Sequence, residues 1–355
     1  MTEDVRPDVP SRVIEAVRRS SGEFLEATGV ARDRRRETLA LGIGAIALVA
    51  SALVVLVLFR LRPLPITGDE SIGLFSAAAS AVVAVGAFLA GRWVVRARRD
   101  THPLLYILDT VALAFAHGVI SLVSWSLLSG VVESGFPGAP VFGFPSMLIA
   151  GTTAGLTAYI AFLSGTRMSA SSLAVLLPLF LIEGLFASML TAGDRQWWKR
   201  NLSALGETDD PSAIAFNVTL VVGGFIVTTL ARYATRGIPS APTHGLARVR
   251  LGLVLVGVSL MLVGALPADA FYWPHTLSAA AMALVFGVVV VFLPRWIPGL
   301  PRLFLFLGWL LAAILVVQFV LFATGYYTLT AVELVVGILV VVWISLFVRI
   351  TAGRR

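Results

Sequence analysis

The stretch DRQWWKRNLSALGETDDPSAIAFNVT, residues 194–219, is the longest polar interruption between two hydrophobic segments of the chain. Apolar runs recur on both sides of it, from Thr38 almost to the C-terminus, and each is about 20 residues long, the length of helix that crosses a bilayer core. The runs are continuous rather than alternating, and backbone in lipid must satisfy its own hydrogen bonds, so they predict helices and exclude a barrel. We therefore expect an all-α, polytopic integral membrane helix bundle.

The composition supports this class. Of the 355 residues, 58% are hydrophobic and 13% are charged, whereas soluble proteins average about 25% charged residues. The net charge of +7 does not indicate nucleic-acid binding, because the arginines lie in short clusters at the ends of hydrophobic runs. The absence of cysteine excludes disulfides, thiolate catalysis and cysteine-based zinc sites, and no cofactor is predicted.

The charge distribution predicts ten spans with both termini in the cytoplasm. Arginines gather at 92–99, 232–250, 295–302 and 349–355, on the side predicted to be cytoplasmic, and most acidic loop residues fall on the other side. We expect the protein to lie in the plasma membrane with this positive-inside orientation. The expected spans are 38–59, 72–95, 104–132, 142–164, 171–191, 212–232, 249–266, 275–294, 301–322 and 330–350.

Four regions are expected along the chain. Residues 1–37 form a cytoplasmic polar tail, in which residues 11–28 have the spacing of an amphipathic helix that lies on the membrane or on cytosolic loops, or contacts a protein partner. The alternative is a loosely ordered tail. Residues 38–95 form a transmembrane hairpin, residues 100–350 an eight-helix membrane domain, and residues 351–355 a cytoplasmic end. The first apolar run follows the polar tail and is too long for a signal peptide, so we expect it to be retained.

Three ionisable residues are predicted inside the membrane: Asp109 and His117 in the third span and Glu183 in the fifth. Such residues are costly in lipid and either pair with a neighbouring helix or serve a function. His117 and Glu183 lie at comparable depth and could form a buried pair. One interpretation of the three residues is structural, and the other is the polar path of a secondary transporter.

The outer half of the bundle holds more polar groups. An outward-facing pocket could be lined by residues from the long loop and from the outer ends of four spans, namely Asn201, Ser203, Asn217, His275, Gln318 and Glu333. Trp197, Trp198 and Trp273 are typical of interfacial anchors. Their neighbours Arg195, Lys199 and Arg200 could attract lipid phosphate.

Catalytic motifs are scarce in the sequence. It contains no P-loop, HExxH or GxSxG motif, and its four histidines are predicted at different depths, which excludes a three-histidine metal site. A metal held by His275, Asp269 and another carboxylate stays open. A membrane-embedded lipid hydrolase is a second alternative, in which His275 is the general base or a ligand and Asp269 orients it. It requires these two side chains to lie within hydrogen-bond reach of each other or of Ser203.

An ordered series of short motifs resembles a known family. The motifs are WWKRNLSALG at 197–206, FN at 216–217, GG at 223–224, the glycines 252, 257 and 264, Pro267 and His275. Together they resemble the bacterial membrane family named domain of unknown function 998, best over 190–295, with its hydrophobic helices extending over 100–350 and the first two spans as additions. The resemblance implies no reaction and marks Asn201, Ser203, Leu205, Gly206, Asn217 and His275.

The leading hypothesis from the sequence is a membrane protein, with no catalysis assigned, that binds a lipid or a small polar ligand in an outward-facing pocket. Its expected partners are membrane lipids and not nucleic acid. The hydrolase and the transporter remain as alternatives.

Overall fold

The computed structural model describes residues 11–95, 103–207, 209–235 and 242–352, so the predicted cytoplasmic arginines at 96–99 lie outside the described residues. Ten long helices make up the described part: α1 (Ser11–Phe59), α2 (Ile72–Val94), α3 (Pro103–Gly135), α4 (Gly143–Thr166), α5 (Ala170–Thr191), α6 (Pro211–Ala234), α7 (Thr243–Ala265), α8 (Tyr272–Trp296), α9 (Arg302–Ala323) and α10 (Leu329–Ala352). Each is long and apolar enough to cross a membrane. The prediction of an all-helical, ten-span membrane protein is confirmed.

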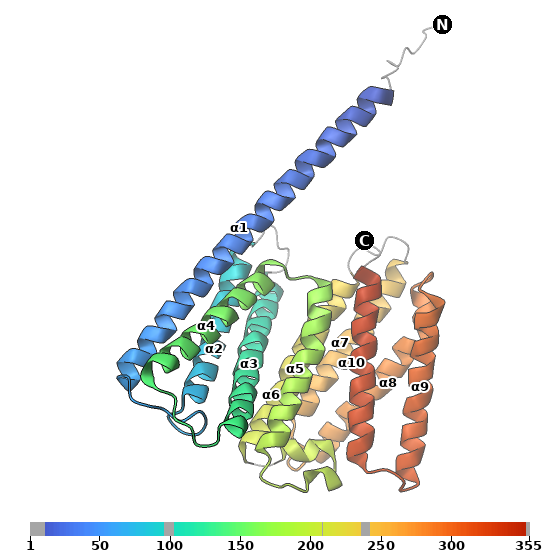
Figure 1. The fold of residues 1–355 in the computed structure, drawn as a ribbon. Coiled ribbons are helices and arrows are strands. Elements are labelled where there is room, and N and C mark those ends of the chain that lie inside the picture. Colours follow the sequence, from blue (N-terminus) through green and yellow to red (C-terminus); the bar gives the residue numbers. More distant parts are fainter. Residues whose placement is uncertain (1–10, 96–102, 208, 236–241, 353–355) are drawn as a thin grey trace.

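The connections between helices alternate between two sides of the bundle (Figure 1). We call the side that carries the connections at 60–71, 136–142, 192–210, 266–271 and 324–328 the loop side, and the opposite side the terminal side. The loop side is the one that the sequence predicts to face outward. Helix α1 enters the bundle and α10 leaves it on the terminal side, which agrees with an even number of spans. That this side is cytoplasmic stays a prediction.

Helix α1 is one continuous helix of 49 residues whose first half projects beyond the rest of the bundle (Figure 1). The segment 11–28, expected as a separate amphipathic helix, is therefore helical but runs directly into the first span. The intervening residues 30–38 are mainly alanine, arginine and glutamate, which favour helix and provide no stop signal. Its contact with a partner stays a prediction.

Helix α4 packs between α1 and α2, and these two helices scarcely touch each other. A Cβ atom on Gly155 of α4 would lie 3.0 Å from the carbonyl oxygen of Gly44 in α1. On the other flank, a Cβ on Gly165 would lie 2.5 Å from the carbonyl oxygen of Phe88 in α2. Glycine thus allows close backbone approach on both sides of α4. The predicted hairpin of the first two spans does not pack as a pair, because α4 separates them.

Helices α5 to α10 form the second half of the bundle. Helix α6 packs against α5 and α7, α7 packs against α8, and α10 packs against α5. A Cβ on Gly224 of α6 would lie 2.4 Å from the carbonyl oxygen of Gly257 in α7. Helix α9 stands at the edge of the bundle (Figure 1), where Phe304 and Gly308 are its buried residues.

Helix α3 joins the two halves. It packs against α2 on one side and against α5 and α6 on the other. The carboxylate of Asp109 in α3 accepts hydrogen bonds from Arg232 and Thr229 of α6, the latter at 2.9 Å. An ion pair that replaces water on both partners thus links the halves on the terminal side.

Candidate functional site

The long polar loop folds on the loop side between α5 and α6. Asp210 caps α6 by accepting from the N–H of Ala213 at 3.3 Å, and Pro211 occupies the first helical position. The second carboxylate oxygen of Asp210 accepts from the N–H of Gly193 at 2.9 Å. The two ends of the loop are thereby held together by one side chain.

Within the loop lie two 3₁₀ helices, η1 (Trp197–Lys199) and η2 (Leu202–Gly206). Asn201 starts η2, because its side-chain oxygen accepts from the N–H of Ala204 at 2.7 Å. Helix α10 contacts both 3₁₀ helices. Glu333 accepts from the N–H of Leu202 in η2 at 2.5 Å, and the Thr330 hydroxyl donates to the carbonyl of Trp198 in η1 at 2.7 Å.

Helix α6 holds the far end of η2. The side-chain amide of Asn217 donates to the carbonyl of Gly206 at 3.0 Å. A Cβ on Gly206 would lie 2.5 Å from the Asn217 side-chain oxygen and 2.8 Å from the ring of Phe216, so this close approach requires glycine. The Ser212 hydroxyl adds a bond to the carbonyl of Leu205 at 3.1 Å.

Helix α8 contributes a histidine to the loop. His275 Nε2 lies 2.9 Å from the Ser203 hydroxyl oxygen, and Nδ1 lies 2.8 Å from the carbonyl oxygen of Leu266. A carbonyl only accepts, so Nδ1 carries the proton and Nε2 accepts from the serine, if the imidazole is neutral. His275 is buried, with 6% of its surface exposed, whereas Ser203 is half-buried. The Ser203 hydroxyl is thereby hydrogen-bonded to Nε2, while the Leu266 carbonyl fixes the orientation of the imidazole ring through Nδ1.

Asp269 does not orient this histidine. The Leu266 carbonyl occupies the Nδ1 position that the hydrolase hypothesis assigned to Asp269, and Asp269 itself is exposed. A tight turn at 266–271 leads directly into α8 and leaves the aspartate on the surface. Among the described residues, no group of three or more His, Asp or Glu side chains could hold a metal, so the metal alternative with His275 and Asp269 finds no third ligand.

Five of the six predicted pocket residues contact the segment 201–206 or belong to it, namely Asn201, Ser203, Asn217, His275 and Glu333. The exception is Gln318 on α9, whose buried side-chain oxygen has no partner among the described residues. Sequence reasoning missed Thr330 and the Leu266 carbonyl. Thr330 lies three residues before Glu333 on the same helix face, which was an available signal, whereas the sequence does not mark a backbone carbonyl.

The exposed rim of the loop is cationic and aromatic. Arg200 is paired with Glu207 at 2.9 Å. Lys199 lies over the ring of Trp198, 5.7 Å from its centroid, and Arg195 is exposed with no partner among the described residues. Exposed Trp198 and Trp273 are placed as interfacial anchors would be.

The three intramembrane residues form three separate helix contacts. Asp109 bonds to α6, as described above. The His117 ring bonds to the Leu113 carbonyl at 2.7 Å and to Ser164 of α4 at 2.8 Å. Glu183 of α5 accepts from Ser124 of α3 at 2.9 Å. The suggested pair of His117 and Glu183 is not formed, because both ring nitrogens of the histidine have other partners.

The loop site lies within a recognisable family region. The family described as protein of unknown function, DUF998, matches residues 173–350, which is half of the chain and includes all six residues marked by the motifs. The match begins in α5, so α3 and α4, which were expected within the family region, lie outside the matched residues. Neither a curated protein nor a solved structure matches the chain. The extent of the family match shows that the chain, a multi-pass membrane protein, belongs to the DUF998 family of proteins of unknown function.

Proposed function

We propose that the protein binds the headgroup of a lipid, or a similar small polar ligand, on the loop side, and that Ser203 and His275 form the polar part of this site. The proposal places it in the plasma membrane of a bacterium, with the terminal side in the cytoplasm. The observation that carries it is the hydrogen bond of 2.9 Å between half-buried Ser203 and buried His275. A hydroxyl oxygen that donates to the histidine keeps lone pairs that can accept from a ligand.

The surroundings of this pair favour a phosphate-bearing headgroup. Arg195 and Lys199 are exposed cations in the same loop, beside exposed Trp198. Basic residues next to a span attract anionic lipid, each by about 1 kcal/mol. Arg200 is less suited to this role, since it is already paired with Glu207.

Short-chain dihexanoylphosphatidylglycerol, titrated into the full-length protein in detergent, tests the proposal. Replacing both Arg195 and Lys199 by alanine removes two cations and should weaken binding about 30-fold, from about 2 kcal/mol in total. Adding Ser203→Ala to this double variant should weaken lipid binding further. Arg302→Ala, an exposed arginine on the terminal side, is the matched control. Unchanged affinity in the double variant would refute a headgroup site here.

A second candidate function, acyl-ester hydrolysis, is favoured by the same pair because its geometry is that of a nucleophile and its base. In this reaction Ser203 Oγ attacks the acyl carbonyl of a lipid while His275 Nε2 takes the hydroxyl proton. The alcohol then leaves with that proton, and water releases the acyl group from the serine. The Leu266 carbonyl holds the imidazole in the tautomer that this step needs.

A fluorophosphonate probe distinguishes the two functions. Hydrolase chemistry predicts covalent labelling that is lost in Ser203→Ala and reduced at least 100-fold in His275→Gln, since the glutamine keeps a polar side chain without a base. Ser278→Ala is the control, because among the described residues the Ser278 hydroxyl bonds only to Pro274 of its own helix. An unlabelled wild-type protein would remove the hydrolase and leave the binding site in place.

A further inference from the structure

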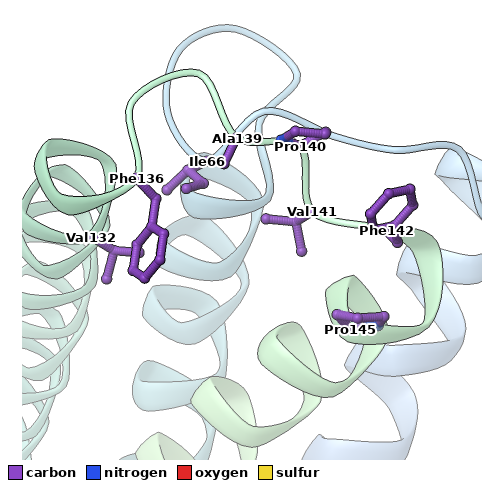
Figure 2. Close-up of a pocket in the computed structure, with 8 residues that line it drawn as sticks. All are labelled: Ile66, Val132, Phe136, Ala139, Pro140, Val141, Phe142 and Pro145. Carbon is purple, nitrogen blue, oxygen red and sulfur yellow. The ribbon is translucent and has the colours of Figure 1, made fainter.

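A second site lies on the loop side of the other half of the bundle, between the ends of α3 and α4 (Figure 2). It is a groove with a volume of about 280 Å³, close to the lower end of small-molecule pockets at about 300 Å³. Its lining residues are all of apolar type. The residues that shape it are Ile66, Val132, Phe136, Val141, Phe142 and Pro145.

The groove exists because α3 and α4 are tied together deeper in the membrane and not at this end. Trp125 of α3 donates to Thr157 of α4 at 2.9 Å. Val132 lies seven residues further along α3, or about 10 Å at 1.5 Å per residue. There the α3–α4 connection bonds instead to the α1–α2 connection, through two backbone hydrogen bonds of 2.8 and 2.9 Å between Leu64 and Val141. The helix ends are therefore left apart.

A strained turn adjoins the groove. Arg60 and Leu61 follow α1 with φ angles of +49° and +61°, a left-handed conformation that costs a non-glycine residue roughly 1–2 kcal/mol. Gly143 directly follows groove residue Phe142. A Cβ on Gly143 would lie 2.5 Å from the Cα atom of Leu61, so the turn packs closely against this position. Strain of this kind persists where the surrounding packing fixes it, and it is concentrated at functional sites.

The turn carries one cation that forms no ion pair among the described residues. The Arg60 side chain is exposed and has no partner among the described residues. By contrast, Arg62 is paired with Glu70 at 2.7 Å and lies over the Phe59 ring. The nearby Glu133 accepts from the N–H of Gly138 at 2.9 Å. Asp69, nine residues after Arg60, is the other exposed charge of this connection that forms no ion pair among the described residues.

We propose that this groove holds an acyl chain of a phospholipid whose phosphate contacts Arg60. The groove lies where the spans end, which is the depth at which acyl chains meet headgroups. Its apolar lining suits a hydrocarbon chain, and arginine binds phosphate through paired N–H donors. Phe136 and Phe142, both in its lining, are exposed aromatic side chains of the kind found at membrane interfaces.

Native mass spectrometry of the full-length protein tests the proposal, with Arg195→Ala/Lys199→Ala as the background so that the loop site does not contribute. The probes are dioleoylphosphatidylglycerol, dioleoylglycerol, which has no phosphate, and glycerol phosphate, which has no acyl chain. We expect one retained dioleoylphosphatidylglycerol, about tenfold weaker binding of dioleoylglycerol for loss of a charge-assisted contact, and no retained glycerol phosphate.

Two variants and one control locate the lipid. Ala139→Phe fills the groove and should abolish retention, and Arg60→Ala should reduce phosphatidylglycerol binding to the level of dioleoylglycerol. Arg62→Ala, whose partner is Glu70, should change nothing. Because the Arg60 side chain is exposed, Arg60→Ala should leave the packing of the helices unchanged. It therefore tests the phosphate contact even if Ala139→Phe does not fold. Equal binding of both lipids by wild type, retention in Ala139→Phe, or a dimer that this variant dissociates would overturn the proposal.

Discussion

The docking of the polar loop onto α6 can be measured by removing one hydrogen bond. Asn217→Ala deletes the donor to the buried carbonyl of Gly206 and leaves that carbonyl unpaired. An unsatisfied buried group costs about 1–3 kcal/mol, and the middle of this range, about 2 kcal/mol, corresponds to about a 30-fold change in an equilibrium constant. The fraction of molecules with the loop undocked should rise by that factor.

The natural absence of cysteine provides the assay. A single Ala204→Cys substitution places a thiol at a position that is 1% exposed, so a maleimide reacts only when the loop opens. In the slow-reaction limit the labelling rate follows the open fraction. We expect Asn217→Ala to accelerate labelling about 30-fold, by the magnitude worked out above.

Asn217→Asp should accelerate labelling at least as much, because it turns a carboxylate oxygen toward the Gly206 carbonyl. Ser278→Ala on α8 removes a hydroxyl that bonds only to Pro274 of its own helix, and should leave the rate within a factor of two. Labelling that stays at the wild-type rate in Asn217→Ala would refute the reasoning, because it would show that the Asn217–Gly206 hydrogen bond does not hold the loop against α6.

Two further predictions concern the contacts that assemble the bundle. Asp109→Asn removes the charge opposite Arg232 between α3 and α6. Both side chains are about one-fifth exposed, so we expect a loss of stability at the low end of the range for breaking a buried pair, about 3 kcal/mol. The thermal-unfolding midpoint in detergent should fall, and a midpoint equal to wild type would contradict this. Gly245→Ala places a Cβ 1.9 Å from the Trp296 carbonyl oxygen and should abolish the yield of monodisperse protein, whereas Gly287→Ala meets nothing within 4 Å and should keep it.

The number and order of the spans were predictable because each apolar run is long, continuous and bounded by polar residues. The packing of those spans was not. In lipid, the surface of a helix that faces a neighbour is as apolar as the surface that faces the membrane, so composition does not show which helices touch. Gly44 and Gly155 indicate close approach of some helix, but only the structure shows that α4 lies between α1 and α2.

The proximity of some candidate side chains was predictable from the sequence, whereas their role as a site stays a prediction. Topology and motif order placed Asn201, Ser203, Asn217 and His275 at one end of the bundle, and the structure joins Ser203 to His275. The error at Asp269 arose because six residues of separation before a helix suggest proximity, whereas the turn directs the aspartate to the surface. The actual partners of Asn217 and Glu333 are backbone groups, whose availability depends on the fold and not on residue type.

The two proposed sites separate cleanly along the chain, and this division bears on what each one does. The loop site is built from α6, α8 and α10 within residues 173–350, so it belongs to the part that the DUF998 family shares. The groove is built from the ends of α3 and α4 and the connections beside them, outside the matched residues. Both lie on the loop side, and α3 links the halves through Asp109 and Arg232. A family function is therefore to be sought first at Ser203 and His275, with the groove as a lipid contact that the first four helices add.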